Sequence, residues 1–134
     1  MIPDDADRAL RVRSADRFYD LHVHIPMQKI VADMLRPADG HDHIGVAQAR
    51  EQLQTALAIA DRELAGECWA GGDEFSMADC SAAPPLFFIN IMMPLAGEFP
   101  RVAGYLERMK ARRSYARVLQ EAEPYLAYFP GNPK

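Results

Sequence analysis

The chain has 134 residues, 49% of them hydrophobic and 25% charged, and a formal net charge of −4. These values are typical of one globular domain with a sizeable core, and the acidic balance argues against binding to nucleic acid or to an anionic membrane. No apolar run is long enough to span a membrane. We therefore expect one cytoplasmic domain, residues 1–134, in which Cys68 and Cys80 are free thiols.

The first predicted helix is long and runs from Asp4 to about Leu35, where Arg36-Pro37 closes it. Two sets of residues at helical spacing define two covered sides. The first set is Leu10, Ser14, Phe18, Leu21 and Ile25, and the second is Val12, Ala15, Tyr19, His22, Pro26 and Ile30. We expect the first side to face the core and the second to be exposed for a partner. Pro26 is expected to kink the helix.

Four further helices are predicted, and no segment shows the alternation of a strand. They cover about Gly45 to Ala65, Met77 to Met93, a segment that begins at Pro100, and a short segment capped by Ser114 that ends before Pro124. The apolar stripe of the second helix consists of Val46, Ala49, Leu53, Leu57, Ala60 and Leu64. The predicted fold class is all-α.

The helix expected from Met77 to Met93 is apolar on nearly every side, which places it in the middle of a core. Ser76 stands at its N-cap position with Asp79 three residues later, so the two can form a capping box. A catalytic role for Asp79 would need a raised pKa and a partner group, and the structural role is favoured. We expect Ser76→Ala and Asp79→Ala each to cost about 0.5–2 kcal/mol of stability, without adding.

The same stretch resembles a known family. The buried helix in glutathione transferases begins with a capping motif. The residues that fit this motif, in order, are Gly72, Phe75, Ser76, Ala78, Asp79 and Cys80. Phe99-Pro100 and Arg112-Arg113-Ser114 are also similar to that family's C-terminal helical domain. The resemblance extends from about Ile2-Pro3 to Phe129-Pro130. It implies a bundle of about five helices around a buried central helix.

In that family glutathione is conjugated to an electrophile. The helical domain supplies the hydrophobic wall of the electrophile pocket and part of a dimer interface. A thioredoxin-like domain, which activates the glutathione thiol and precedes the helical domain, is expected to be missing here. The resemblance therefore implies that this chain alone is inactive and binds no cofactor, with glutathione as co-substrate of an assembled enzyme. The expected partners are the thioredoxin-like domain or a second copy, and a small apolar electrophile.

An alternative function is a stand-alone helical module that binds a protein or an apolar ligand without catalysis. For the transferase function, the resemblance implies candidate residues from the first helix and from the end of the chain, none of them catalytic. The candidates for the electrophile-binding wall are Tyr19, His22, Val23, Tyr125, Tyr128 and Phe129. Those expected near the charged ends of glutathione are Asp16, Arg17 and Asp20.

Three polar clusters have a functional interpretation that we weigh against a structural one. His22 and His24 point about 200° apart on a helix and cannot chelate one metal. Zinc could be held by His41, Asp42 and His43, but no further ligand or supporting shell is evident, and a mobile polar loop without metal is favoured. A basic cluster comprises Arg108, Lys110, Arg112, Arg113 and Arg117. A solvated surface that pairs with nearby glutamates is favoured there over nucleic-acid binding.

Overall fold

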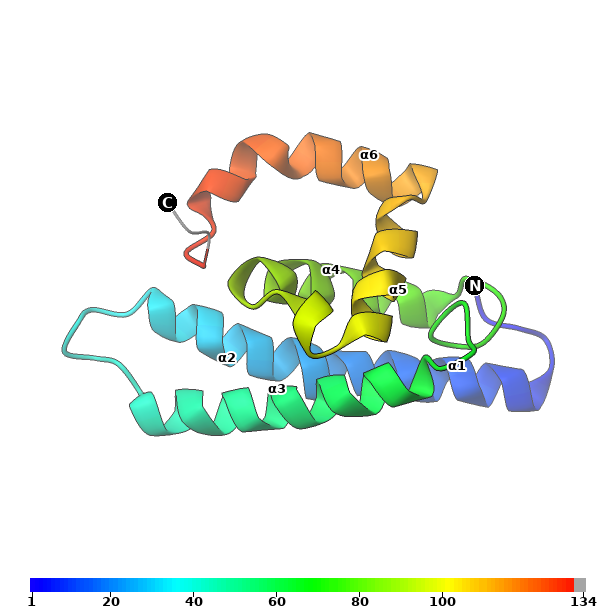
Figure 1. Ribbon diagram of the computed structural model, residues 1–134, viewed down its shortest axis with the longest axis horizontal. Helices are drawn as coiled ribbons and strands as arrows, with labels where there is room; N and C mark the ends of the chain where they lie inside the picture. The colour runs from blue at the N-terminus through cyan, green and yellow to red at the C-terminus, as the bar shows by residue number, and fades with distance from the viewer. Residues whose placement is uncertain (132–134) are drawn as a thin grey trace.

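The computed structural model describes residues 1–131 and confirms the all-α prediction (Figure 1). The α-helices are α1 (Ala6–Phe18), α2 (Ile25–Met34), α3 (His43–Glu63), α4 (Met77–Met92), α5 (Pro100–Lys110) and α6 (Arg113–Ala122). A π-helical segment, Tyr19–His24, joins α1 to α2, and 3₁₀ segments cover Leu95–Gly97 and Glu123–Tyr128. We call the continuous helix formed by α1, the π segment and α2 helix one. Within the described residues no helix is long and apolar enough to cross a membrane.

Helix one passes Pro26 by widening its turn. The N–H of Ile25 donates to the carbonyl of Asp20, five residues earlier, as in a π-helix. A proline lacks an N–H, and its ring clashes with the carbonyl four residues before it in an α-helix. A wider turn just before Pro26 relieves that clash, so the helix continues to Met34. The expected disturbance at Pro26 therefore takes the form of a π turn.

The side of helix one that faces the core is the opposite of the one expected. Val12 and Tyr19 are only 2% and 3% exposed, whereas Leu10 and Leu21 are 66% and 48% exposed. Both sides have helical spacing, so spacing could not choose between them; the choice depends on which side α4 covers. The predicted exposed patch around Val12 and Tyr19 is therefore wrong. The exposed apolar side of helix one instead contains Leu10, Leu21 and Ile25.

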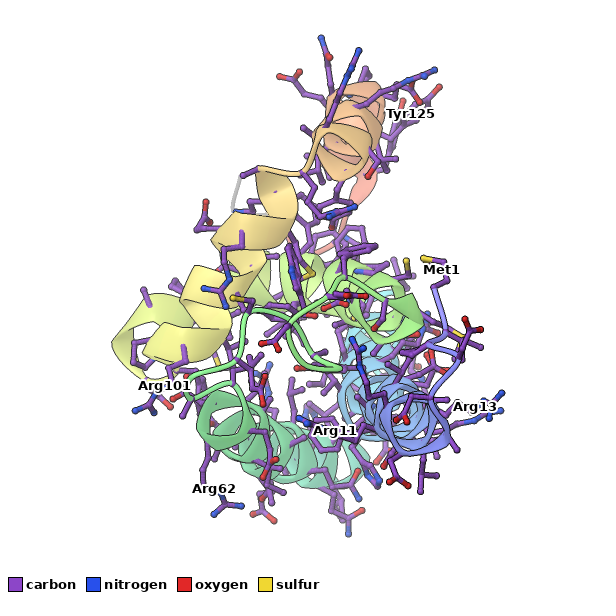
Figure 2. All side chains as sticks on the ribbon, turned by 90° about the vertical axis from the view of Figure 1, so that its right-hand side faces the viewer. Met1, Arg11, Arg13, Arg62, Arg101 and Tyr125 are labelled. Atoms are coloured by element: carbon purple, nitrogen blue, oxygen red, sulfur yellow. The ribbon has the colours of Figure 1, made fainter. Side chains whose placement is uncertain are left out.

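The expected central position of the third predicted helix, now α4, is confirmed. Figures 1 and 2 show α4 between α6 on one side and the pair formed by helix one and α3 on the other. The buried residues of α4 are Ala78, Asp79, Ala82, Ala83, Pro85, Leu86 and Ile89. The predicted stripe of α3 also faces the core, with Ala49, Leu53, Leu57 and Ala60 buried. The bundle thus forms around α4.

The capping box at the start of α4 is confirmed, and its carboxylate makes further contacts. Oδ2 of Asp79 accepts from the Ser76 N–H at 2.7 Å and from the Ser76 hydroxyl at 3.2 Å. Oδ1 accepts from the Ala70 N–H at 2.9 Å and from the Tyr105 hydroxyl at 2.6 Å. Burial, with Tyr19 and Asp79 close by, raises the pKa of Tyr105, so its hydroxyl keeps the proton that it donates. The fully buried Asp79 thus joins α4 to the preceding loop and to α5.

The last two helices begin in different ways. At the start of α5, Oδ1 of Asp61 in α3 accepts from the N–H groups of Arg101 at 2.8 Å and Val102 at 3.0 Å. The N-cap residue of α6 is Arg112, whose side chain makes no capping hydrogen bond. Ser114 lies inside the first turn, so the prediction that it caps the helix is wrong. Of these two helices, α5 is the one whose first N–H groups are bonded by a side chain of the described residues.

Candidate functional site

A groove runs between helix one and α3, and its larger hollow has a volume of about 1000 Å³. Helix one contributes Phe18, Leu21, His22 and Pro26 to the lining. The α3 side contributes Gln48, Glu51, Gln52, Thr55, Ala56 and Ile59. One wall of this hollow is therefore mainly apolar and the other mainly polar, as expected of a site that binds an apolar body and orients it by a few polar groups.

A smaller hollow of about 330 Å³ continues the groove towards the end of α3. Its lining consists of Arg11, Ser14, Ala15, Phe18, Tyr19, Ile59, Ala60, Glu63, Leu64, Glu67 and Ala70. Arg11 and Glu67 form an ion pair of 3.1 Å within this lining, and Figure 2 shows Arg11 between helix one and α3. Because Phe18 and Ile59 line both hollows, they mark the boundary between the two.

Three ring side chains of helix one stand together at this boundary. The Phe18 ring centroid lies 5.3 Å from that of Tyr19 and 5.7 Å from that of His22. Burial, together with the nearby Asp79 carboxylate, raises the pKa of Tyr19, so its phenol stays neutral. Phe18 and His22 therefore offer aromatic contact surface for a flat apolar ligand, whereas Tyr19 is buried behind them.

The six predicted wall residues do not lie in one place. Tyr19 lines the smaller hollow, and His22, whose side chain is exposed, lines the larger one. Val23 is fully buried in the core and lines neither hollow. The tail residues lie on the other side of α4, where Figure 2 shows Tyr125 on the raised α6 side of the molecule. They are Tyr125 and Tyr128, which are 70% and 82% exposed, and Phe129, whose ring lies 4.7 Å from that of Phe88.

The three residues expected near glutathione have different surroundings. Asp16 accepts a hydrogen bond from the Ser81 hydroxyl of α4, which holds helix one against α4. Arg17 is exposed. Asp20 is partly buried, and its backbone carbonyl accepts the hydrogen bond of the π turn from the Ile25 N–H. Asp16 therefore already has a structural partner, whereas Arg17 is the most accessible of the three.

The groove also contains residues that the sequence did not single out as site residues. Phe18 was assigned to the core side of helix one, and the polar residues of α3 received no functional assignment. A signal was available in α3, because Gln48, Glu51, Gln52 and Thr55 recur at helical spacing on one side. What the spacing could not show is that helix one packs beside this side.

The loop between α2 and α3 is fixed by hydrogen bonds, contrary to the mobile loop expected. Asp33 accepts from the Asp42 N–H at 2.7 Å and contacts Nδ1 of His41 at 2.9 Å. The bond from the Asp42 N–H, and then that to His41, lowers the pKa of Asp33. Asp42 caps α3 by accepting from the Gly45 N–H at 2.8 Å. The rings of His41 and His43 lie 6.0 Å apart, and residues 1–131 contain no group of three side chains placed to hold a metal.

Comparison with known sequences gives one family and one curated relative. Residues 44–108 match the family model described as "Glutathione S-transferase, C-terminal domain". The curated relative is a tetrachloro-p-hydroquinone reductive dehalogenase of Sphingobium chlorophenolicum, 37% identical over 83 residues. The match covers 59% of this chain and 34% of the relative, so the chain corresponds to about a third of that protein.

Solved structures share the fold over most of the chain. A glutathione S-transferase from Methylobacterium radiotolerans, in complex with glutathione sulfonate, matches 87% of this chain and 56% of its own, with a TM-score of 0.75 and 23% identity. One from Methylobacillus flagellatus with glutathione bound matches 87% of this chain and 58% of its own, with a TM-score of 0.79 and 21% identity. Identities this low show a common fold, and this chain spans little more than half of either structure.

Proposed function

We propose that the chain is a glutathione S-transferase C-terminal domain, which the match of residues 44–108 to that family model supports. It would supply the electrophile-binding wall and part of the dimer interface of a glutathione-conjugating protein. We assign the thiol-activating residue to a thioredoxin-like domain, as the family resemblance implies. Glutathione is then the co-substrate, a proposal supported by the similar solved structures that hold glutathione or glutathione sulfonate. Two free cysteines suit a cytoplasmic location.

The observation that carries this proposal is the groove beside helix one. Its hollows place Phe18, Tyr19 and His22 next to a polar side of α3. The name of the curated relative, a tetrachloro-p-hydroquinone reductive dehalogenase, supports a substrate class. We therefore propose a halogenated aromatic electrophile, whose flat ring would pack on Phe18 while its oxygens meet the amides and hydroxyl of α3.

We expect the purified chain to bind tetrachloro-p-hydroquinone, and Phe18→Ala to weaken that binding about tenfold. Removing the ring deletes one side of an aromatic contact, a loss of about 1.5 kcal/mol. Isothermal titration of the wild type and the variant gives the two dissociation constants. Phe129→Ala is the matched control, because its ring packs on Phe88 at the tail and lines neither hollow.

The control also separates the two candidate walls. Equal binding by wild type and Phe129→Ala, with a loss in Phe18→Ala, supports a wall on helix one. The reverse pattern would move the wall to the tail and contradict the groove. A wild-type chain that binds no halogenated aromatic at millimolar concentration would contradict a preformed wall in this domain.

We propose that a second copy covers the exposed apolar side of helix one and encloses the neighbouring groove. Leu10, Leu21 and Ile25 are exposed there, and Figure 2 shows Arg13 of the same helix pointing outward. The α3 side carries exposed carboxylates such as Glu51.

The dimer is expected to dissociate when charge is placed on this side. Sedimentation equilibrium should show a dimer for the wild type and a monomer for Leu21→Glu combined with Ile25→Glu, because two carboxylates cannot be buried unpaired. Leu35→Glu combined with Ile44→Glu is the control, since both side chains are exposed but lie at the loop end of the helix pair. A wild type that is monomeric at high micromolar concentration, or a control pair that dissociates equally, would contradict this interface.

A further inference from the structure

The smaller hollow of the groove carries an excess of negative charge. Its charged lining residues are Arg11, Glu63 and Glu67. Arg11 and Glu67 pair with each other at 3.1 Å, whereas Glu63 has no ion pair among the described residues. Arg62, the cation next to Glu63 on α3, does not line the hollow, and Figure 2 shows it pointing away from helix one. The lining therefore has a net negative charge.

Two further features add to this negative character. The hollow lies at the C-terminal end of α3, whose last residue is Glu63, and the last carbonyls of a helix carry the negative end of its dipole. The carboxylate of Asp79 is also near, since it accepts from the N–H of Ala70, a residue that lines the hollow. Burial, and then this carboxylate, raises the pKa of Tyr19. The surroundings therefore favour a cation over an anion.

The hydroxyl of Tyr19 is a polar group of this lining that lacks a partner. The residue is only 3% exposed, and its hydroxyl makes no hydrogen bond within the described residues. In residues 1–131, the one side-chain nitrogen or oxygen that is fully enclosed without a partner is Nε of Arg112. The Tyr19 hydroxyl therefore opens onto space that solvent can reach, and the smaller hollow is the one that Tyr19 lines. Because polar groups of buried residues are normally hydrogen-bonded, its lone pairs are available to a ligand.

The remainder of the lining is mostly apolar and encloses a small volume. Phe18, Ile59 and Leu64 contribute apolar surface from both helices. A volume of about 330 Å³ is at the lower end of the range for ligand pockets. The hollow therefore suits a ligand with one ring, or an apolar body of similar size, and one charged group.

From these observations we propose that the smaller hollow binds a small primary amine in its protonated form, with an ammonium group on an apolar body. An ammonium group has three N–H donors and no acceptor. These donate to the Glu63 carboxylate and to the hydroxyls of Tyr19 and Ser14, all of which line the hollow. Neither Tyr19 nor Glu63 lines the larger hollow, so this site does not rest on the halogenated aromatic proposed there.

The test is an amide NMR titration of the whole chain with benzylammonium chloride, and with benzyl alcohol as a neutral probe of similar shape. Sodium chloride keeps the ionic strength constant. Signals of residues 14–19 and 59–64 should move in a saturable way with benzylammonium. Benzyl alcohol should bind at least about tenfold more weakly, because it cannot pair with the Glu63 carboxylate. Equal affinities for the two probes would overturn the proposal.

Three variants identify the groups that hold the ammonium. Tyr19→Phe keeps the ring and removes the hydroxyl, so it should weaken binding about tenfold. Glu63→Gln changes an exposed residue, which leaves the fold intact, and should weaken binding by a similar factor. Glu98→Gln is the matched control, because it removes the same charge from an exposed position outside the hollow. It should leave the dissociation constant within about twofold.

Two results of the variant series would also overturn the site. The first is binding that neither Tyr19→Phe nor Glu63→Gln weakens. The second is a loss in Glu98→Gln as large as that in Glu63→Gln, which would indicate attraction by the overall charge of the chain. A wild type that shows no saturable shift at millimolar benzylammonium would contradict the site directly.

Discussion

Asp79→Ala is expected to lower the free energy of unfolding by about 3–5 kcal/mol, well above the usual cost of a lost helix cap. The carboxylate is fully buried and accepts from the Ala70 N–H, the Ser76 N–H and hydroxyl, and the Tyr105 hydroxyl. Removing it leaves these donors buried without an acceptor, at about 1–3 kcal/mol each before the structure relaxes. Urea unfolding of the variant and the wild type measures the difference.

Ser76→Ala is the matched comparison, because it removes one member of the capping box and leaves the carboxylate in place. We expect it to cost about 1 kcal/mol. Asp79→Asn keeps the size but presents an N–H₂ group to a donor, so it should resemble Asp79→Ala more than the wild type. Equal losses for Ser76→Ala and Asp79→Ala would show that the box alone matters and that the bonds to Ala70 and Tyr105 contribute nothing.

Asp61→Ala is expected to cost about 2–3 kcal/mol, the second largest effect. Asp61 lies on α3 and is nearly buried. Its Oδ1 accepts hydrogen bonds from the first two N–H groups of α5. The variant leaves the buried N–H of Val102 unpaired and detaches the start of α5 from α3. Urea unfolding again provides the measurement.

The control for this variant separates the cap from a surface ion pair. Arg101 also reaches Asp61 with its guanidinium, at 3.3 Å, but its side chain is exposed. Arg101→Ala removes that ion pair and keeps both backbone bonds, so it should cost less than about 0.5 kcal/mol. A loss in Arg101→Ala as large as that in Asp61→Ala would contradict the backbone role of the carboxylate.

The parts of the fold that the sequence predicted are those that local chemistry determines. Ser76 and Asp79 are three residues apart, so the start of α4 follows from the capping rule alone. Pro100 at the first position of α5 and the apolar stripe of α3 are equally local. These features need no knowledge of the neighbouring helices, and the structure confirms all three.

The parts that the sequence did not predict depend on contacts between distant elements. Helix one has two sides at the same spacing, and only the position of α4 decides that Val12 rather than Leu10 is buried. The cap of α5 comes from Asp61, about forty residues earlier, for which no local motif exists. For the candidate groove, the family resemblance named Tyr19 and His22, which line its hollows, but it did not indicate the polar side of α3.

The contacts of Asp79 also have a consequence for the order in which the chain folds. Ser76 is three residues away along the chain, Ala70 nine and Tyr105 twenty-six. Closing a short loop costs less chain entropy than closing a long one, so the bond to Ser76 can form while α5 is still detached. The bond to Tyr105 forms only once α5 has docked. One carboxylate therefore takes part in an early local step, the nucleation of α4, and in a late one, the closing of the core.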